Sequence, residues 1–261
     1  MTAVGTGNVL HVLIQPFCLR FSLHEDEIVY LVAGAAEMQL DRMELLLGID
    51  PKTQSLFDSN LGFLPVATTV LIRSEKTIVV DPGNHHIGFY GILALALRRF
   101  GLTPADVDLV VCTHSHHDHM GSLFVFRGKP LVLGAGEADY ARMVYGAEET
   151  DARLRAMGPI TEVPLHEEVE LAPGVRAVST PGHTPGHISV LVEAGAERIV
   201  VAGDTVMTRR EYLDRRFSHW YTADQLVQLQ ANADRLQAWR PTRLLPGHDR
   251  ELRLGPGGVA A

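Results

Sequence analysis

The residues best suited to chemistry are concentrated in one heptapeptide, THSHHDH, at residues 113–119. Five of its seven side chains can bind a divalent cation or move a proton. Imidazole suits zinc, iron and other borderline cations, and a carboxylate also accepts harder ones. The heptapeptide directly follows the apolar run at residues 109–112, which is typical of a buried strand. A strand end is a rigid mount, so the pattern favours a metal site over a histidine-rich surface loop.

The spacing within the heptapeptide separates its ligands into two pairs. His114 and His116 stand two residues apart where the chain leaves the strand, so both can point the same way and bind one ion. Asp118 and His119 follow where the chain is expected to turn into a helix, and they aim at a neighbouring point. His117 occupies the spacer position and is expected to face solvent or support a ligand. The spacing therefore indicates two adjacent ions.

Three apolar runs elsewhere end in a Pro-Gly turn, in the sequences DPG at residues 81–83, PGH at 181–183 and PGH at 246–248. Glycine lets the backbone pass close to a bound group, so these strand ends are expected to converge on one place. With the aspartate of the GDT sequence at 203–205 included, strand ends supply seven candidate metal ligands: His114, His116, Asp118, His119, His183, Asp204 and His248.

The order of these motifs, H-x-H-x-D-H, then Pro-Gly-His, then Gly-Asp-Thr, then Pro-Gly-His, resembles the metallo-β-lactamase superfamily from about residue 66 to residue 250. The resemblance implies an α/β fold, a four-layer αββα sandwich with the metals at one edge between its two sheets. We expect residues 1–261 to form a single domain of this kind, with flexible ends at residues 1–8 and 255–261.

The resemblance also implies a role for each ligand. It assigns the first of two divalent metal ions to His114, His116 and His183, assigns the second to Asp118, His119 and His248, and makes Asp204 the bridge. It implies a hydroxide shared by both ions as the nucleophile, because coordination lowers the pKa of water from 15.7 to about 7. Asp118 is expected to help move a proton. Zinc is the expected metal, although these ligands also accept iron, manganese or cobalt.

Departures from other members of the superfamily narrow the activity. The commonest dinuclear zinc β-lactamases carry Cys at the position of Asp204 and lack a ligating histidine at that of His119. Flavodiiron oxygen reductases carry Glu at the position of His116 and have an appended flavin domain. Glyoxalase II proteins place a helical domain around the last histidine, whereas this chain ends at residue 261. The tRNA 3′-processing nucleases begin with a Gly-rich motif that is not found here.

The chain is most similar to the N-acyl-homoserine lactonase group, to which the segments at residues 180–187 and 247–249 correspond. We therefore expect a hydrolase that opens a lactone, ester or thioester, with an N-acyl-homoserine lactone as the leading substrate. One departure is Met207, because these lactonases commonly place there a tyrosine that assists the carbonyl oxygen. Tyr212 or Tyr221 could supply that hydroxyl from a neighbouring turn.

Several activities remain open on the sequence alone. A basic cluster at residues 209–216 contains four arginines; it is either a solvated surface or a site where Arg210 receives an anionic group of the substrate. Aromatic residues at 217, 220 and 221 could also stack on single-stranded nucleic acid, which would suit a nuclease or phosphodiesterase. The ligand set would also serve a glyoxalase II-like thioesterase or a metal-binding scaffold without catalysis.

Four residues outside the ligand set are expected to support the site. Asp81 is expected to brace the metal loops, and His187 to orient the turn that carries His183, because a metal-bound imidazole needs an outer partner. His85 and His86 follow the first Pro-Gly turn and are candidates for substrate contact at the mouth of the cleft.

Amino-acid composition restricts the partners and the location that we expect for this protein. The net charge of -8 argues against broad binding to nucleic acid, although a local basic patch remains possible. The two cysteines suggest no disulfide framework, and no apolar run approaches the roughly 18 residues of a membrane span. We expect a cytoplasmic protein with a small-molecule substrate and no membrane partner; a homodimer would be consistent with the lactonase resemblance.

The elements that must position these residues alternate between strand and helix, which indicates layered α/β architecture. Strands are expected at residues 9–14, 27–32, 66–73, 77–80, 109–112, 130–133, 169–171, 175–180, 188–192, 198–201 and 243–245. Helices are expected at 87–100, from 103 onward with a Pro at the first position, at 137–145 and at 223–239. Residues 37–47 stay undecided, and residues 146–158 are expected to form a surface loop or lid.

Overall fold

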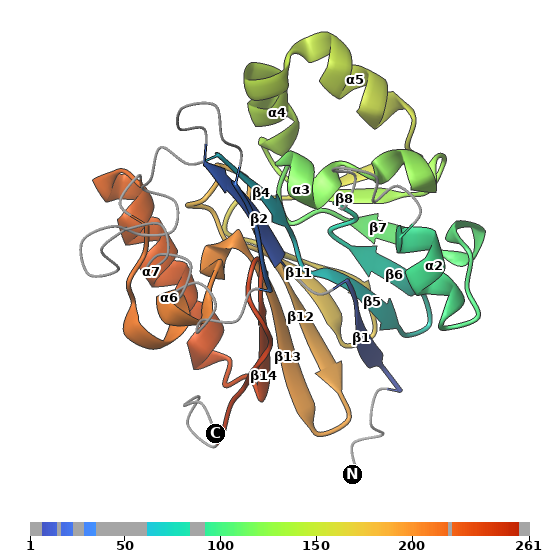
Figure 1. Ribbon diagram of the computed structural model, residues 1–261. Coiled ribbons are helices and arrows are strands. Elements are labelled where there is room, and N and C mark those ends of the chain that lie inside the picture. The colour runs from blue at the N-terminus through green and yellow to red at the C-terminus, as the bar shows by residue number, and fades with distance from the viewer. Residues whose placement is uncertain are drawn as a thin grey trace.

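Two six-stranded sheets pack face to face, and helices cover the outer face of each sheet (Figure 1). The structure, a computed structural model, describes residues 7–14, 17–22, 29–34, 62–83, 92–218 and 221–255. The first sheet has the order β1-β5-β6-β7-β8-β9, in which β6 to β9 run parallel. Its strands are β1 (Val9–Ile14), β5 (Thr69–Arg73), β6 (Thr77–Val80), β7 (Leu109–Val111), β8 (Leu131–Gly134) and β9 (Ile160–Val163).

The second sheet follows chain order from β10 to β15 and is antiparallel except for the parallel pair β13 and β14. Its strands are β10 (Glu168–Ala172), β11 (Val175–Ser179), β12 (Ile188–Ala194), β13 (Glu197–Gly203), β14 (Arg243–Pro246) and β15 (Leu252–Arg253). A small antiparallel sheet has the order β3-β2-β4, made of β3 (Val29–Gly34), β2 (Phe17–Ser22) and β4 (Gly62–Val66).

Helices flank both sheets. The α-helices are α2 (Ile92–Arg98), α3 (His117–Met120), α4 (Glu137–Tyr145), α5 (Ala147–Arg155), α6 (Arg209–Asp214) and α7 (Ala223–Ala238). The 3-10 turns are η2 (Pro104–Asp106), η3 (Leu123–Phe126) and η4 (Asp204–Val206). Among the residues that the structure describes, no helix has the combination of length and apolar character needed to span a bilayer.

The core is layered because the central strands are apolar on both faces. In β6, Ile78 and Val80 face the second sheet and share a core cluster with Val190 and Val201, while Val79 between them belongs to the cluster under the outer helices. Strands buried on both faces show continuous apolar runs instead of alternation. On the outer faces, α2 packs on the first sheet and α7 on the second. These layers confirm the expected αββα sandwich.

The parallel strands bring the expected ligands to one edge. The ends of β6 and β7 in the first sheet lead into residues 81–83 and 113–119. The ends of β13 and β14 in the second sheet lead into Asp204 and residues 246–248. Because carboxyl ends of parallel neighbours lie at the same edge, motifs far apart in the sequence converge there.

Three sequence expectations were wrong. The expected strand at residues 66–73 is two strands in different sheets, because Thr68 crosses toward the second sheet and donates its N–H to the Gly247 carbonyl (2.8 Å) and its hydroxyl to that of Pro246 (2.7 Å). Residues 146–158 are largely the helix α5, whose buried Leu154 is too isolated in sequence to signal amphipathicity. The expected flexible end at 1–8 excludes Asn8, whose amide donates to the carbonyls of Pro173 and Glu193.

Other expectations agree with the structure within a few residues, including β1, the helix at 137–145 and α7. The strands β2, β9 and β15 were not expected. The undecided segment at 37–47, residues 87–91 of the expected helix at 87–100, and the chain ends at 1–6 and 256–261 lie outside the described residues.

Candidate metal centre

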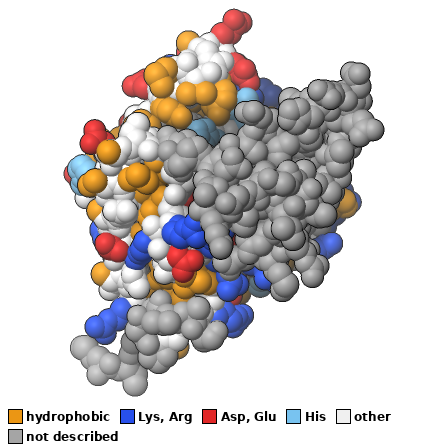
Figure 2. Space-filling view, turned by 60° about the vertical axis from the view of Figure 1, so that its left-hand side comes forward, with side chains coloured by type: hydrophobic (Ala, Val, Ile, Leu, Met, Phe, Trp, Pro, Cys, Tyr) orange, Lys and Arg blue, Asp and Glu red, His pale blue; other side chains and the backbone are white. Residues whose placement is uncertain are grey.

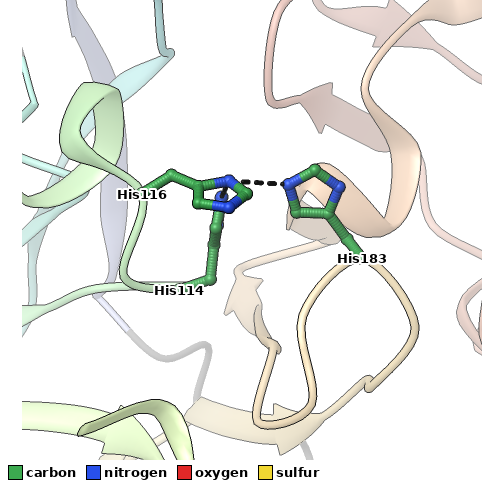
Figure 3. A group of neighbouring side chains, drawn as sticks. All are labelled: His114, His116 and His183. Carbon is green, nitrogen blue, oxygen red and sulfur yellow. Dashed lines mark hydrogen bonds between the residues drawn. The ribbon is translucent and has the colours of Figure 1, made fainter. Parts of the chain in front are cut away.

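Three histidines from two loops point their ring nitrogens at one another (Figure 3). Nε2 of His114 lies 2.9 Å from Nδ1 of His116, and that same Nδ1 lies 3.0 Å from Nε2 of His183. His114 and His116 follow β7 of the first sheet, whereas His183 lies in the turn between β11 and β12 of the second. The expected first group of ligands is therefore assembled across the two sheets.

A second group lies beside the first. Nε2 of His248 lies 3.2 Å from Oδ2 of Asp118 and 3.3 Å from Nε2 of His119. Asp118 and His119 belong to the short helix α3, as the sequence indicated, and His248 follows β14. These three residues also satisfy the geometry of a metal site, with all candidate ligand atoms within 4.8 Å of one another.

Asp204 lies between the two groups. Its Oδ2 is 3.3 Å from Nε2 of His183 on one side and 3.3 Å from Nε2 of His248 on the other. Its Oδ1 is 3.3 Å from Nε2 of His119. One carboxylate thus faces imidazoles of both groups.

The spacing of these nitrogens fits divalent ions. Imidazole nitrogens bound at 2.0–2.1 Å around a tetrahedral zinc ion lie about 3.3 Å apart. The approaches of 2.9 to 3.3 Å among His114, His116, His119, His183 and His248 are close to that value. In addition, Oδ1 of Asp204 is buried and makes no hydrogen bond of good geometry with any described residue. Converging nitrogens and an unsatisfied carboxylate oxygen are the donor set expected of a metal centre.

Glycine permits the loops to close around this cluster. A Cβ atom at Gly247 would lie 1.9 Å from Oδ1 of Asp204, and one at Gly83 would lie 1.4 Å from the backbone oxygen of Asp118. Any side chain at either position would push a ligand out of place. The Pro-Gly turns are therefore required by close approach, as the sequence indicated.

Asp81 fixes the orientation of His119. Its Oδ2 accepts hydrogen bonds from Nδ1 of His119 (2.8 Å) and from the hydroxyl of Thr113 (2.8 Å), and its Oδ1 accepts one from the N–H of Thr113 (2.7 Å). With Nδ1 protonated toward Asp81, Nε2 of His119 is left to bind metal. Asp81 has a φ of 53°, a left-handed conformation that aspartate tolerates better than most residues. The expectation that Asp81 braces the loops fits these contacts.

His183 and Asp204 have supporting partners of their own. Nδ1 of His183 lies 2.6 Å from the hydroxyl of Tyr221, which in turn donates to Sδ of Met207 (3.3 Å). Nε2 of His187 accepts the backbone N–H of Asp204 at 2.9 Å. His187, expected to orient the turn of His183, also holds the backbone of Asp204.

Two supporting residues were missed in the sequence, and both belong to α4. Glu137 is fully buried and accepts the N–H of Ser115 at 2.8 Å. The hydroxyl of Tyr140 lies 3.2 Å from Nε2 of His116. Their spacing of three residues in the expected helix at 137–145 places them on one face. Their position on one helix face was the sequence signal that could have identified both residues.

Charges in the cluster divide the histidines into two kinds. Burial lowers the pKa of His183 to about 3 and that of His114 well below its usual range. Burial also opposes charge on His248, but the carboxylates of Asp204 and Asp118 outweigh it and raise the pKa to about 10. The same carboxylates, together with Asp81, raise the pKa of His119. Without metal, these buried carboxylates therefore favour the charged forms of His119 and His248.

The remaining candidates lie farther from the ligands or outside the described residues. Met207 and Tyr221 are 4% and 7% exposed beside His183, so little of either reaches the surface. Tyr212 is 3% exposed in the core between β13 and α7, a position that does not favour the expected substrate contact. Arg210 is partly exposed on α6. His85 and His86 lie outside the described residues.

The basic cluster at 209–216 is partly structural. Arg215 pairs with Asp234 of α7 at 2.9 Å and donates to the side chain of Gln237. Figure 2 shows one face on which Lys and Arg side chains are interspersed with Asp and Glu across its described part.

His117 stacks on Tyr145 with ring centroids 4.0 Å apart, in keeping with its expected supporting position.

Comparison with known proteins agrees with this architecture. The family model described as the metallo-beta-lactamase superfamily matches residues 61–248. An N-acyl homoserine lactonase of Bacillus cereus is 27% identical over 183 residues, which is 61% of this chain and 71% of the lactonase. A probable metallo-hydrolase of Methanocaldococcus jannaschii is 32% identical over 153 residues, 56% of this chain and 69% of that protein.

A solved structure from Thermotoga maritima, described as a putative metallo-beta-lactamase, superimposes with a TM-score of 0.64 at 17% sequence identity. The superposition covers 95% of this chain and 99% of that one. At this identity the likeness concerns the fold, and it extends over nearly the whole chain.

Proposed function

The chain belongs to the metallo-beta-lactamase superfamily and is a metal-dependent hydrolase, and we propose that it uses two divalent ions to open a lactone ring. The leading substrate is an N-acyl-homoserine lactone, with simpler esters or thioesters as related substrates. The observation that carries the dinuclear proposal is the position of Asp204, whose carboxylate lies 3.3 Å from nitrogens of both ligand groups. The lactonase from Bacillus cereus supports the choice of substrate.

Each candidate ligand has a proposed role in metal binding. His114, His116 and His183 would hold one ion, and Asp118, His119 and His248 the other, with Asp204 between them. Zinc is the proposed metal because an imidazole-rich set with carboxylates suits it. When bound, such ions bring the pKa of water close to neutrality and polarise a carbonyl group. Every other contribution comes from the protein itself.

Asp118 is the proposed proton carrier. Its side chain is 12% exposed, more than the 3% of Asp204, and its Oδ2 lies 3.2 Å from Nε2 of His248. A carboxylate at the rim of the cluster can accept a proton from the attacking water and pass it to the departing alkoxide. Tyr221 is proposed to orient His183, because its hydroxyl lies 2.6 Å from Nδ1 of that residue.

A substrate panel tests the activity. The purified, metal-loaded protein is assayed on lactones with different acyl chains, on thioesters and on bis-p-nitrophenyl phosphate. We expect ring opening of N-acyl-homoserine lactones, followed as acid release at constant pH. Hydrolysis of the phosphate diester alone would overturn the proposal in favour of a phosphodiesterase.

Arg210 provides a second test of the substrate. If it receives an anionic group, Arg210→Ala raises KM for anionic substrates and leaves KM for uncharged lactones unchanged. Arg216→Ala is the matched control, because Arg216 is exposed in the same cluster. If the wild type, Arg210→Ala and Arg216→Ala have the same KM for anionic substrates, the basic cluster is a solvated surface that does not bind the substrate.

A further inference from the structure

Glu137 connects the two loops that carry the first group of histidines. Its Oε2 accepts the backbone N–H of Ser115, the residue between His114 and His116, at 2.8 Å. Its Oε1 accepts the N–H of Gly186 at 3.0 Å and the hydroxyl of Thr184, which follows His183. One carboxylate therefore binds the loop after β7 and the turn between β11 and β12.

This connection crosses the sandwich. The loop after β7 extends from the first sheet, whereas the turn between β11 and β12 belongs to the second. Glu137 itself begins α4 directly after β8 of the first sheet, and its side chain is fully buried. A buried carboxylate is costly unless its oxygens accept hydrogen bonds, and here both oxygens do. An apolar residue would fill the space but could not tie the two loops together.

The backbone is shaped for this contact. A Cβ atom at Gly186 would lie 2.5 Å from the carbonyl oxygen of Ala135 and 3.0 Å from Cγ of Glu137. A Cβ atom at Gly134 would lie 1.7 Å from the carbonyl oxygen of Gly186. The start of α4 and the turn of His183 can therefore meet only because both positions are glycine.

The same helix also contacts a ligand ring. One turn after Glu137, the hydroxyl of Tyr140 lies 3.2 Å from Nε2 of His116, whose Nδ1 faces the other histidines. The helix α4 thus contacts the backbone of both loops and the outer nitrogen of one ligand. Asp81 contacts Thr113, whose hydroxyl lies 3.1 Å from Nδ1 of His114, but its own contact with a ligand ring is to His119 of the second group.

We propose that Glu137 is a positioning residue for the first metal ion: by tying the two loops it sets the 3.0 Å approach of His116 Nδ1 to His183 Nε2. The proposal rests on the proposed function only in that metal binds this triad, and it does not depend on the substrate. It assigns the connection between the two loops to Glu137, whereas the direct contact of Asp81 with a ligand ring is to His119 of the second group.

The test is metal binding by Glu137→Gln. Glutamine keeps the shape, but its amide nitrogen cannot accept a hydrogen bond, so either Ser115 or the turn at 184–186 loses its acceptor. Zinc affinity is measured by competition with a chelator in two backgrounds, each of which retains one group. The His248→Ala background retains the triad of His114, His116 and His183, whereas the His183→Ala background retains Asp118, His119 and His248.

In the His248→Ala background we expect Glu137→Gln to lower zinc affinity about 10- to 100-fold, the usual effect of losing an outer partner of a metal ligand. In the His183→Ala background the affinity stays the same. Cobalt substitution gives a second readout, because its visible absorption reports coordination geometry at the triad. Glu251→Gln is the matched control, since Glu251 is a partly buried carboxylate that pairs with Arg243 at 2.7 Å instead.

A purely structural role predicts a different result. In that case Glu137→Gln lowers the melting temperature while zinc affinity and the cobalt spectrum stay as in the parent, and the proposal is overturned. If Glu137→Gln does not fold, Thr184→Val removes only the hydroxyl donor, and a smaller loss confined to the triad is expected; unchanged affinity then overturns the proposal. A wild-type chain that binds two ions and opens no lactone contradicts the proposed substrate alone.

Discussion

The hydroxyl of Tyr221 lies 2.6 Å from Nδ1 of His183, and the two residues are 38 positions apart in the chain. Tyr221 immediately precedes α7, whose first turn is fixed by hydrogen bonds between Thr222 and Gln225. The tyrosine is therefore held by a well-capped helix, and it holds the histidine in turn. Its hydroxyl accepts from His183 and donates to Met207, so both of its hydrogen-bonding functions are used.

Tyr221→Phe tests this relationship. Removing the hydroxyl leaves Nδ1 of His183 without its partner, and we expect about a 10- to 100-fold loss of metal affinity. Tyr212→Phe is the control, because the Tyr212 hydroxyl is buried and has no hydrogen-bond partner among the described residues. Zinc titration of both variants checks the expectation. Equal affinities would show that Tyr221 is a packing residue.

Asp81→Asn should weaken binding of the second metal ion. An asparagine can offer only one acceptor where Asp81 now accepts three hydrogen bonds from Thr113 and His119. We expect about a 10- to 100-fold loss of zinc affinity. Unfolding in urea should also become easier by roughly 1–3 kcal/mol, because a buried donor is left unsatisfied. Asp108→Asn, at the other end of β7, is a control in which zinc affinity stays unchanged.

Asp204→Ala should remove both activity and metal. Asp204 faces His119, His183 and His248, so its loss affects both groups at once. We expect turnover to fall by at least about 100-fold, beyond the range seen for outer partners alone. Metal content is measured by elemental analysis after dialysis, with exposed Asp214→Ala as the control. Full activity with two bound ions would refute the bridging role.

Glu211→Gln should change the pH dependence of stability in the metal-free protein. Burial raises the pKa of Glu211 to about 8, with Asp204 adding to the rise, while the backbone N–H groups of Met207 and Thr208 and the charge of His248 oppose it. Because the pKa in the folded state lies above the ordinary value of 4.5, the folded protein holds a proton that the unfolded chain has released between these values. Its contribution to stability is complete below that window and is lost as pH rises toward 8.

One such proton makes the unfolding free energy fall by up to about 1.4 kcal/mol per pH unit. We expect the difference between wild type and Glu211→Gln to show this slope between about pH 5 and pH 8, measured by urea unfolding with chelator present. His119 and His248 are present in both proteins, so the difference reports the removal of the Glu211 carboxyl together with its coupling to the charge of His248. Parallel stability curves would show that Glu211 is ionised throughout.

The sequence predicted well which side chains converge, because metal chemistry restricts candidate ligands to few residue types at fixed spacings. The Pro-Gly turns located the strand ends, and parallel pairing then explains why distant motifs meet. The residues that support the candidate ligands were harder to predict from the sequence. Glu137 and Tyr140 belong to a helix whose limits were expected, yet their contacts depend on how α4 docks against a distant turn, in which Gly186 lies 49 residues after Glu137.

The errors have physical causes as well. The strands β4 and β5 are separated only by Ala67 and Thr68, so the local pattern could not reveal a change of sheet. The helix α5 is mostly polar, with Glu148 and Glu149 in its first turn and Arg153 and Arg155 in its last. Such a helix is stabilised by its dipole and side-chain pairs instead of by an apolar stripe, and periodicity does not detect it.

Residues from the first sheet supply His114, His116, Asp118 and His119, and residues from the second supply His183, Asp204 and His248. Each ion would therefore draw ligands from both halves, and neither half alone carries a complete set. Either set of ligands is therefore complete only when the two sheets have docked against each other.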